Sequence, residues 1–593
     1  MSPEMRLEDY LDAEGNIEIP AGVTLTSFMD RHAEQSGEAP AYRYLDYDRD
    51  CTVELSWAAL RTRLRAVGAR LQQITDTGDR IAILAPQGVE YVVGFFAAIQ
   101  AGGIAVPLFA PELPGHAERL EAVLGDAQPT VVLTTTAAAP AVRDFIKTIP
   151  RERRPRMLAV DAVPDAVGEH FTPARIATDD IAYLQYTSGS TRTPAGVEIT
   201  HRGAATNVVQ MIESVGLDWN TRSVSWLPLF HDMGLLMIMF PALVGGHITL
   251  MSPVAFVRRP YRWLRELGAS DKPTFAAAPN FAFELAAQRG RPPADETLDL
   301  SNVAGLINGS EPVSMASVDA FVAAFAPYGL DPAAIKPSYG MAEATLFVST
   351  TESGTAPKAV HLDRQALGGG DAVQVGADDA DAVVSVSCGQ IARSQWAVIV
   401  DPQTDAELPD GRVGEIWLHG DNIGRGYWNR TDETELTFRN KLQSRLAEYS
   451  HAEGAAESAL WLRTGDLGVY IDGQLHITGR VKDLVIVDGR NHYPQDIEAT
   501  VAEASKAVRS GFVAAFSVPG VGREEVVIVA ERAPGAGRAD AAPIVDAIRA
   551  AVSRRHAIPL ADIKLVAAGV IPRTTSGKLA RRACRARYLD GTL

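Results

Sequence analysis

The stretch RIAILAPQGVEYVVGFFAAIQAGGIAVPLFA, residues 80–110, decides the fold class of this chain. Residues 80–86 and 103–109 are short apolar runs typical of buried strands, and the apolar segment 88–102 between them is long enough for a crossover helix. A strand, a helix and a second strand in this order form a βαβ unit. The stretch therefore predicts an α/β protein.

The same pattern recurs further along the chain. Other short apolar runs each end in polar, glycine or proline residues, as strands do before a strand-to-helix loop: residues 130–136, 223–230, 247–251, 274–279 and 303–310. Alternating strands and helices favour doubly wound sheets, in which the functional site lies at the carboxyl ends of the strands. We expect a large N-terminal domain of two such sheets.

Two changes in composition mark the organisation of the rest of the chain. Residues 351–384 are rich in glycine, alanine and aspartate and suggest an insertion with weak structure, whereas the segments that follow are typical of short antiparallel strands in a small β-barrel-like subdomain. From Gly479 onward a new alternation of strands and helices begins. We therefore expect two domains, residues 1–478 and a smaller mobile α/β domain of residues 479–593.

Composition and charge argue against several classes of protein. With 593 residues the chain exceeds what one hydrophobic core organises, and its 46% hydrophobic and 22% charged residues are typical of a soluble globular protein. The net charge of −17 argues against extended binding to nucleic acid, which needs a dominant basic surface. We find no apolar run of about 18 residues that could span a bilayer, and the acidic N-terminus lacks the features of a secretory signal.

The cysteines and the basic segments say less about the function. Cys51, Cys388 and Cys584 lie far apart and have no metal-ligand spacing, so we expect inert thiols in a reducing, cytoplasmic protein. Two basic stretches, residues 257–267 and 578–588, are either solvated helical faces or surfaces for a partner.

A loop with the composition of a phosphate site reads YTSGSTRTPAGV, residues 186–197. Its hydroxyl groups and exposed backbone suit phosphate oxygens. The residues concerned are Thr187, Ser188, Gly189, Ser190 and Thr191. The loop lacks the lysine of a P-loop NTPase, and alone it is equally well explained as a flexible turn.

Further motifs follow in a set order. They are PSYGMAEAT at 337–345, WLRTGD at 461–466, GRVKD at 479–483 and IPRTTSGK at 571–578. With the loop, this series resembles the adenylate-forming superfamily of acyl-activating enzymes over essentially the whole chain. The resemblance implies that ATP activates a carboxylic acid: the acid attacks the α-phosphorus, pyrophosphate leaves and an acyl-adenylate remains.

The resemblance assigns three residues to the chemistry. Lys578 would bridge the substrate carboxylate and the α-phosphate, His231 of the segment SWLPLFHDMGL would lie near both, and Glu343 would bind Mg²⁺. Each residue also has an ordinary structural explanation: an exposed lysine before a basic helix, a structural histidine or a surface glutamate.

The resemblance also implies a nucleotide site. Tyr339 would stack on adenine, Asp466 would accept hydrogen bonds from the ribose hydroxyls, and Arg480 would support the ribose. Neighbouring residues complete this site: Asn308, Gly309, Ser310, Glu311, Gly340, Met341 and Ala342. Lys482 and Asp483 are hinge candidates, because the smaller domain must carry its lysine in and out of the site.

Departures from the common loop pattern TSGSTGxPKG indicate the branch. This chain has Arg192 in place of the glycine and Ala195 in place of the lysine. Both departures, with the HDMGL and NGSEPV segments, resemble the fatty-acyl-AMP ligases, and in particular the actinobacterial members that feed long acyl chains to a polyketide synthase for mycolic-acid condensation. In that family the inserted segment restricts the rearrangement used for CoA thioesterification, so the adenylate passes to an acyl carrier protein.

Other functions stay open at this point. A long-chain acyl-CoA synthetase is favoured only if the insertion does not contact the large domain, whereas a non-catalytic lipid or nucleotide sensor conflicts with the presence of Glu343, Asp466 and Lys578. For the ligase we expect an apolar tunnel for a long-chain fatty acid, lined from residues 275–283, and a basic patch that accepts an acidic carrier protein.

Overall fold

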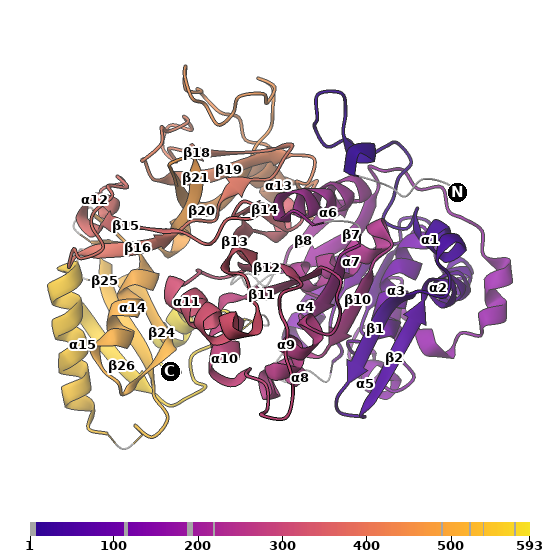
Figure 1. Ribbon diagram of the computed structural model, residues 1–593, viewed down its shortest axis with the longest axis horizontal. Coiled ribbons are helices and arrows are strands. Elements are labelled where there is room, and N and C mark those ends of the chain that lie inside the picture. The colour runs from indigo at the N-terminus through magenta and orange to yellow at the C-terminus, as the bar shows by residue number, and fades with distance from the viewer. Residues whose placement is uncertain are drawn as a thin grey trace.

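The computed structural model describes residues 7–111, 117–186, 194–217, 220–487, 490–520, 524–537, 539–574 and 577–593. Its described strands form a nine-stranded, a six-stranded, a four-stranded and a three-stranded sheet, with two further two-stranded pairs. Figure 1 shows strands and helices interleaved through the larger part of the molecule, with the C-terminal part, in yellow, at one end. The predicted α/β class is therefore confirmed.

The six-stranded sheet contains the predicted βαβ unit. β3 (Arg80–Ile83) and β4 (Ile104–Pro107) pair in parallel, and α3 (Val89–Gln100) joins them with ten of its twelve residues buried. A helix that is apolar on all sides belongs inside the protein. The remaining strands of this sheet are β5 (Val131–Thr134), β6 (Arg156–Ala159), β7 (Ile181–Tyr186) and β8 (Gly196–Thr200), in the order β6-β5-β3-β4-β7-β8.

The nine-stranded sheet is also largely parallel, and antiparallel pairs occur towards its edges. Its strands are β1 (Pro40–Asp46), β2 (Cys51–Ser56), β9 (Arg222–Ser225), β10 (His247–Met251), β11 (Thr274–Pro279), β12 (Val303–Gly309), β13 (Ile335–Gly340), β14 (Phe347–Thr350) and β17 (Gln390–Ile391). Their order is β17-β14-β13-β12-β11-β9-β10-β1-β2.

Two central helices join the large sheets into one core. In α7 (Asp232–Val244) eleven of the thirteen residues are buried, and α6 (His201–Val215) packs beside it. One continuous hydrophobic cluster includes residues from both helices and from both large sheets. The other helices of this part are α1 (Met29–Gln35), α2 (Trp57–Gln72), α4 (Ala117–Ala127), α5 (Ala139–Ile146), α8 (Pro253–Arg258), α9 (Tyr261–Leu267), α10 (Asn280–Arg289) and α11 (Met315–Phe325).

The small subdomain is an antiparallel sheet, as the sequence predicted. It consists of β18 (Gln395–Val400), β19 (Gly414–Gly420), β20 (Leu462–Ile471) and β21 (Gln474–Arg480), with α13 (Thr431–Phe438) beside β20.

The segment predicted to be a weakly structured insertion is a folded hairpin. β15 (Ala359–Asp363) pairs with β16 (Ala382–Val386), and α12 (Arg364–Gly368) follows β15. Apolar residues of the hairpin, including Leu362 and Leu367, share a hydrophobic cluster with β20. The expectation of weak structure was wrong, because these contacts compensate for the glycine-rich and alanine-rich composition.

The C-terminal part has a separate hydrophobic core. Its elements are β22 (Val485–Val487), β23 (Arg490–His492), α14 (Pro494–Ala504), β24 (Val508–Pro519), β25 (Glu524–Arg532), α15 (Ala541–His556), β26 (Leu560–Val566) and α16 (Arg581–Leu589). A single 3₁₀ turn, Val481–Asp483, connects it to β21.

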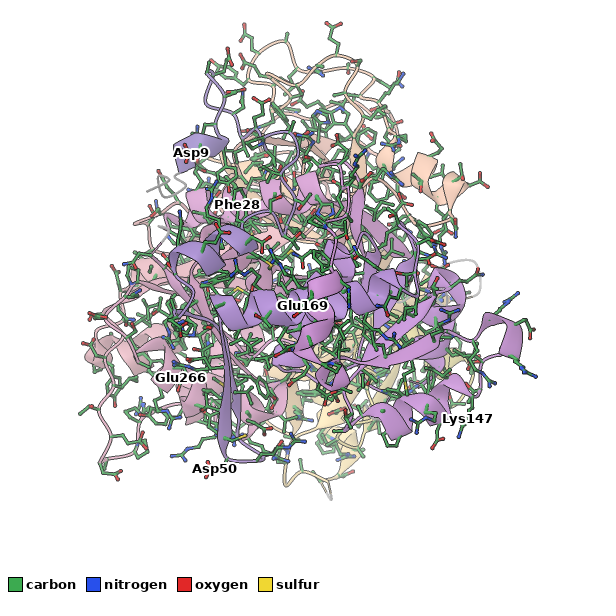
Figure 2. All side chains as sticks on the ribbon, turned by 90° about the vertical axis from the view of Figure 1, so that its right-hand side faces the viewer. Asp9, Phe28, Asp50, Lys147, Glu169 and Glu266 are labelled. Atoms are coloured by element: carbon green, nitrogen blue, oxygen red, sulfur yellow. The ribbon has the colours of Figure 1, made fainter. Side chains whose placement is uncertain are left out.

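Charged residues mark the outside of the N-terminal part. In Figure 2, Asp9, Asp50 and Lys147 lie at the periphery of the molecule in this view. Among the helices of the described segments, we find none with the length and apolar character needed to cross a membrane.

Candidate active site

The carboxyl ends of β12 and β13 form the floor of the site. Asn308 and Gly309 end β12, and Tyr339 and Gly340 end the neighbouring strand β13. A Cβ atom at Gly340 would lie 1.9 Å from the carbonyl oxygen of Leu346, so only glycine fits there. The structure thus brings together two motifs that are about thirty positions apart, at the strand edge where the sequence predicted a site.

Beyond Gly309 the chain turns sharply. Ser310 has a positive φ of 68°, an uncommon conformation for a residue other than glycine. Glu311 accepts a hydrogen bond of 2.7 Å from the backbone N–H of Phe281, and burial raises the pKa of its carboxyl. Asn308 is fully buried and donates to Asn280 Oδ1 at 3.2 Å, while its own Oδ1 accepts no hydrogen bond from the described protein.

A hydrogen-bonded triad joins this floor to the small subdomain. The hydroxyl of Tyr339 donates to Oδ2 of Asp466 at 2.7 Å, and Nε of Arg480 donates to Oδ1 at 3.0 Å. Burial raises the pKa of Tyr339 far above its usual value, and the carboxylate of Asp466 adds to the effect. Asp466 also raises the pKa of Arg480, so the guanidinium group of Arg480 stays charged beside this carboxylate.

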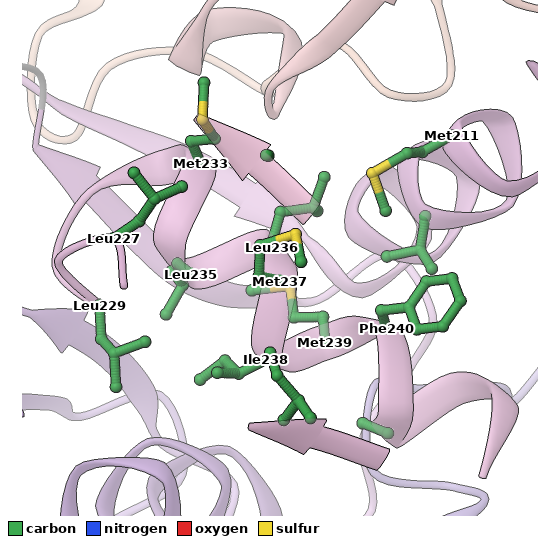
Figure 3. Packing of buried hydrophobic residues seen from close by; sticks show 14 of the residues in the cluster. Met211, Leu227, Leu229, Met233, Leu235, Leu236, Met237, Ile238, Met239 and Phe240 are labelled. Atoms are coloured by element: carbon green, nitrogen blue, oxygen red, sulfur yellow. The ribbon is translucent and has the colours of Figure 1, made fainter. Parts of the chain in front are cut away.

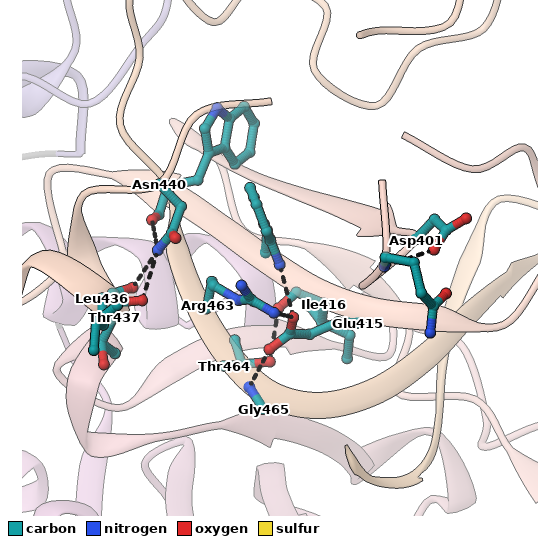
Figure 4. A network of polar contacts seen from close by, with 12 residues as sticks. Asp401, Glu415, Ile416, Leu436, Thr437, Asn440, Arg463, Thr464 and Gly465 are labelled. Carbon is teal, nitrogen blue, oxygen red and sulfur yellow. Dashed lines mark hydrogen bonds and ion pairs between the residues drawn. The ribbon is translucent and has the colours of Figure 1, made fainter. Parts of the chain in front are cut away.

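A buried glutamate of β19 shapes the turn that presents Asp466. Glu415 accepts hydrogen bonds from the backbone N–H of Gly465 at 3.1 Å, from Nη2 of Arg463 at 2.8 Å and from Nε1 of Trp417 at 3.1 Å. Figure 4 shows this network around Glu415. Gly465 has a positive φ of 71°, which favours glycine. The sequence analysis missed Glu415, because a glutamate in an ordinary strand carries no motif.

Glu343 lies on a 3₁₀ turn just past β13. The hydroxyl of Tyr427 donates to its Oε1 at 2.9 Å, and burial raises the pKa of the carboxyl. Within the described ranges, no group of three or more His, Cys, Asp and Glu side chains could hold a metal ion. The carboxylate of Glu343 suits a Mg²⁺ ion that takes its other ligands from phosphate and water.

Lys578 of the C-terminal part reaches the same region. Burial lowers the pKa of its ammonium group, and the carboxylates of Asp232, Glu311 and Asp466 act in the opposite direction. All three carboxylates belong to the large N-terminal part, so the ammonium group lies among residues of that part. The sequence analysis had given Asp232 no role.

His231 stands immediately before α7. Its backbone N–H donates to the carbonyl of Pro228 at 3.1 Å, and its ring centroid lies 4.9 Å from that of Phe230. Asp232 begins α7, which places this pair at the amino end of the helix that lines the core.

The five predicted phosphate-loop residues, Thr187, Ser188, Gly189, Ser190 and Thr191, lie outside the described residues. The flanking residues are described. Tyr186 donates to Asp126 Oδ2 at 2.6 Å, and Nη2 of Arg430 lies 3.3 Å from Asp126 Oδ1 and 2.7 Å from the carbonyl oxygen of Pro194. Asp126 and Arg430 therefore connect both ends of the loop, although no motif marked either residue.

The hinge candidates lie in the connecting 3₁₀ turn. Lys482 is exposed, whereas Asp483 lies 3.6 Å from Nη1 of Arg581 and 3.8 Å from Nε of Arg582. Met341 and Ala342, also predicted for the nucleotide site, lie between Gly340 and Glu343, and Ala342 is buried.

A narrow cavity of about 30 Å³ opens beside Tyr339 and continues between α6, α7 and the large sheet. Its lining residues are mostly apolar: Met211, Met233, Leu236, Met237, Ala277, Ile307, Leu346 and Phe347, with Gly309, Ser310, Ser338, Tyr339 and Gly340 at the strand ends. Figure 3 shows Met233, Leu236 and Met237 along one helix and Met211 on a neighbouring helix.

Of residues 275–283, which the sequence predicted to line an acyl tunnel, one lines this cavity. Ala277 lines the cavity. Phe275 packs instead against Phe240, and Phe283 packs against Trp263 and Phe321 in the core.

Comparisons with known proteins agree with this arrangement. The AMP-binding enzyme family model matches residues 29–428, and a model of the AMP domain of Disco-interacting protein 2-like proteins matches residues 482–593. The long-chain-fatty-acid–AMP ligase FadD32 of Mycolicibacterium smegmatis is 53% identical over 98% of this chain and 96% of its own length. The long-chain-fatty-acid–AMP ligase FadD26 of Mycobacterium marinum is 42% identical, with 95% and 97% covered.

Solved structures give the same result. One from a study of fatty acyl-adenylate ligases of E. coli and L. pneumophila has a TM-score of 0.83 at 29% identity and covers 96% of this chain and 98% of its own. A fatty acyl-adenylate ligase of L. pneumophila in complex with acyl adenylate and pyrophosphate has a TM-score of 0.72 at 29% identity, with 96% of each chain covered. The chain belongs to the AMP-binding enzymes and, within them, to the long-chain-fatty-acid–AMP ligases.

Proposed function

We propose that this ligase joins a long-chain fatty acid to AMP and then transfers the acyl group to the phosphopantetheine thiol of an acyl carrier protein. The carrier is a domain of a polyketide synthase that makes mycolic acid or a related lipid. The observation that carries the first step is the position of Lys578, whose ammonium group, in the C-terminal part, interacts electrostatically with Asp232, Glu311 and Asp466 of the large part. The names of the relatives, long-chain-fatty-acid–AMP ligases of mycobacteria, support a long-chain fatty acid as the substrate.

The first step brings two anions together. A carboxylate oxygen attacks the α-phosphorus of ATP, the bond to the bridging oxygen of the β-phosphate breaks, and pyrophosphate leaves with that electron pair. In our proposal the ammonium group of Lys578 offsets the charge that accumulates between the carboxylate and the α-phosphate. His231 would lie near the same atoms, at the start of α7.

Nucleotide binding would use the strand ends and the triad. Tyr339 is held by Asp466 at 2.7 Å, so its ring has a defined orientation for stacking on adenine. The ribose hydroxyls would donate to Asp466, while the hydrogen bond from Arg480 Nε holds that carboxylate in place. The hydroxyl-rich loop of residues 187–191 would take the β- and γ-phosphates.

A magnesium ion fits at Glu343. When bound, it would neutralise phosphate charge, and Tyr427 would hold the carboxylate of Glu343 in place. Burial raises the pKa of Glu343, and a bound cation would favour its ionised carboxylate.

The cavity beside Tyr339 is the proposed start of the acyl tunnel. Three methionines, Met211, Met233 and Met237, contribute flexible thioether side chains to its wall. Transfer of each methylene from water to such a wall is worth about 0.8 kcal/mol, which favours long acids over short ones.

Contacts of the insertion favour a carrier-protein ligase over a long-chain acyl-CoA synthetase. Arg364 of α12 forms an ion pair with Asp496 of α14, and the hydroxyl of Tyr493 donates to the carbonyl of Leu367 at 3.4 Å. The inserted hairpin also packs on β20 of the large domain. It therefore contacts both proposed domains, and a large rotation of residues 479–593 about a hinge at Lys482 and Asp483 would have to break these contacts.

Of the two basic stretches, residues 257–267 and 578–588, we favour the first as the surface that binds an acidic carrier. Arg581 and Arg582 pair with Asp483 and Glu498, and their side chains are 20% and 34% exposed. Arg258 and Arg259 also form ion pairs, with Asp48 and Glu296, but their side chains are 67% and 56% exposed. We therefore place the proposed carrier contact at α8. The free thiols of all three cysteines agree with the proposed cytoplasmic location.

Product identification under competition tests the proposal. The enzyme is given ATP, Mg²⁺ and a long fatty acid with equal concentrations of CoA and of a holo acyl carrier domain. We expect acyl-AMP and acyl-carrier product with little CoA thioester. Efficient release of the CoA thioester would contradict the carrier step, and absence of any acyl-AMP would contradict the first step.

A further inference from the structure

The proposed catalytic lysine, Lys578, lies on a short hairpin between Arg573 and Leu579. Arg573 and Leu579 form an isolated antiparallel bridge, and the backbone N–H of Thr574 donates to the carbonyl of Lys578 at 2.8 Å. A short two-stranded hairpin is marginally stable in water. Something else must therefore hold Lys578 in a defined position.

Arg573 provides a connection from this hairpin to β24. Its Nη1 donates to the carbonyl oxygen of Gly577 at 2.5 Å, and its Nη2 donates to the carbonyl oxygen of Gly511. Gly577 immediately precedes Lys578, so a guanidinium group that is fixed in place also fixes the backbone next to the lysine.

An aromatic ring holds that guanidinium. The Cζ atoms of Arg573 and Arg509 lie 3.8 Å and 3.4 Å from the ring centroid of Phe512. Two planar groups cannot both stack at this distance on one side of the ring, so they cover opposite faces. Arginine favours such stacking because its charge is spread over a flat, weakly hydrated group.

A β-bulge presents the ring. Val508 pairs with Arg532, but the next paired residue, Val513, faces Ala530, so residues 509–512 leave the ladder. Gly511 has a positive φ of 74° within this bulge. Bulges of this kind redirect side chains and are common next to active sites.

The opposite strand anchors the assembly. Glu531 is completely buried and accepts hydrogen bonds from Nη1 of Arg509 at 2.8 Å and from the backbone N–H groups of Gly569 and Ile571 at 2.8 and 3.2 Å. Glu531 thus joins one arginine of the stack to the segment that leads into the hairpin. The contacts run without a gap from the core of the C-terminal sheet to the residue before Lys578.

Given the proposed function, in which Lys578 acts in adenylate formation, we propose that Arg573, stacked on Phe512 against Arg509, is a positioning residue that sets the location of the Lys578 ammonium group. The stack lies in the C-terminal part and acts through the backbone of Gly577; of the residues proposed for the nucleotide site, Glu311 also interacts electrostatically with Arg573. Without the ring of Phe512 or the guanidinium group of Arg573, the backbone next to Lys578 would lose this support. The binding residues of the large domain would stay in place.

The test uses four variants of the full-length enzyme. Phe512→Leu removes the ring at similar volume, Arg573→Gln removes the fork, and Phe512→Tyr keeps a ring. Lys564→Gln is the matched control, because Lys564 makes a cation–π contact with Tyr588 in the same part of the chain, 5.0 Å from its centroid. Pyrophosphate release at saturating ATP and acid gives kcat, and acetylation of Lys578 by acetic anhydride, followed by mass spectrometry, reports its accessibility.

We expect kcat to fall about 10- to 100-fold in Phe512→Leu and Arg573→Gln, because a displacement of about 1 Å at a catalytic group has this effect. KM for ATP should stay within about threefold of the wild-type value, and Lys578 should be acetylated faster. Phe512→Tyr and Lys564→Gln should match the wild type. Wild-type kcat in both disruptive variants, an unchanged acetylation rate, or equal losses in Phe512→Tyr and Phe512→Leu would each overturn the proposal.

Discussion

The hydroxyl of Tyr339 and the carboxylate of Asp466 are joined by a hydrogen bond of 2.7 Å across 127 positions of sequence. Tyr339 ends a strand of the nine-stranded sheet, and Asp466 lies in the small antiparallel sheet. The bond therefore fixes the two sheets relative to each other at the point where we propose that ATP binds.

Substitution of Asp466 by asparagine should weaken ATP binding. The change removes the charge that Arg480 requires and one acceptor for ribose, and hydrogen bonds to charged groups contribute about 1.5–3 kcal/mol each. We expect KM for ATP to rise about 10- to 100-fold, since each factor of ten is about 1.4 kcal/mol. Tyr339→Phe is the control, because it keeps the ring and should raise KM far less. Equal effects of the two changes on KM would contradict the assignment of Asp466 to ribose.

Substitution of Arg364 by alanine should release CoA activity. The ion pair with Asp496 ties the insertion to the C-terminal part, whereas the ion pair of Arg412 with Asp371 at 2.6 Å ties it to the large domain. We expect Arg364→Ala to increase the yield of CoA thioester, measured by chromatography, and Arg412→Ala to leave it low. The same yield in both variants would show that the Arg364 contact does not restrict rotation.

Enlargement of Met237 should shorten the preferred acid. Met237 and Met239 are both buried on α7, but only Met237 lines the cavity. Met237→Phe should lower kcat/KM for long acids while short acids are spared, because each methylene excluded from the tunnel forfeits about 0.8 kcal/mol. Met239→Phe controls for overpacking of the helix. A parallel loss for all chain lengths in Met237→Phe would place the acyl chain elsewhere.

Asp126 and Arg430 should support the phosphate loop from outside. Their side chains are 17% and 16% exposed, and loss of one partner of a largely buried pair costs about 3–5 kcal/mol. Asp126→Asn should lower the thermal midpoint and raise KM for ATP, and the double variant with Arg430→Met should recover part of the stability. The exposed pair Lys147 and Asp144 offers a control, because Lys147→Met should change neither quantity. An unchanged KM for ATP in Asp126→Asn would show that this pair does not support the phosphate loop.

Acid should destabilise the protein through buried neutral histidines. Burial lowers the pKa of five of them to about 3 or about 4: His32, His201, His247, His476 and His556. Below an unfolded pKa of about 6.5, the unfolded chain binds protons that the folded chain excludes. Stability is therefore complete above that pH and falls as pH drops through this range, by about 1.4 kcal/mol per unit for each histidine.

Urea unfolding at several pH values between 7 and 4.5 measures this loss. His201 Nδ1 accepts a hydrogen bond from the backbone N–H of Leu25 at 3.3 Å, which requires that atom to be unprotonated. His201→Asn keeps an acceptor there but cannot titrate. The slope of unfolding free energy against pH should therefore decrease by the equivalent of one proton, about 1.4 kcal/mol per pH unit. An unchanged slope would show that His201 is not among the responsible groups.

The prediction of weak structure in residues 351–384 was wrong, because composition does not reveal tertiary contacts. Residues 351–384 lack clear strand alternation, yet β15 and β16 pair there, because Leu362 and Leu367 find apolar partners in β20 and in Tyr493. Residues 275–279 are apolar throughout, as suits β11, which is buried on both faces. Periodicity cannot tell which of two buried faces borders a cavity, so Ala277 could not be separated from Phe275 beforehand.

The sequence by itself determined the α/β class, the βαβ unit of residues 80–107 and the order of the motifs that end in Lys578, because hydrophobic periodicity and short motifs are local properties of the chain. Only the tertiary structure decided which side chains meet. Glu415 behind Asp466, Tyr427 on Glu343 and the Arg573 stack on Phe512 each join positions that no local pattern connects. Such pairs depend on how separate sheets pack, and packing is a property of the whole chain.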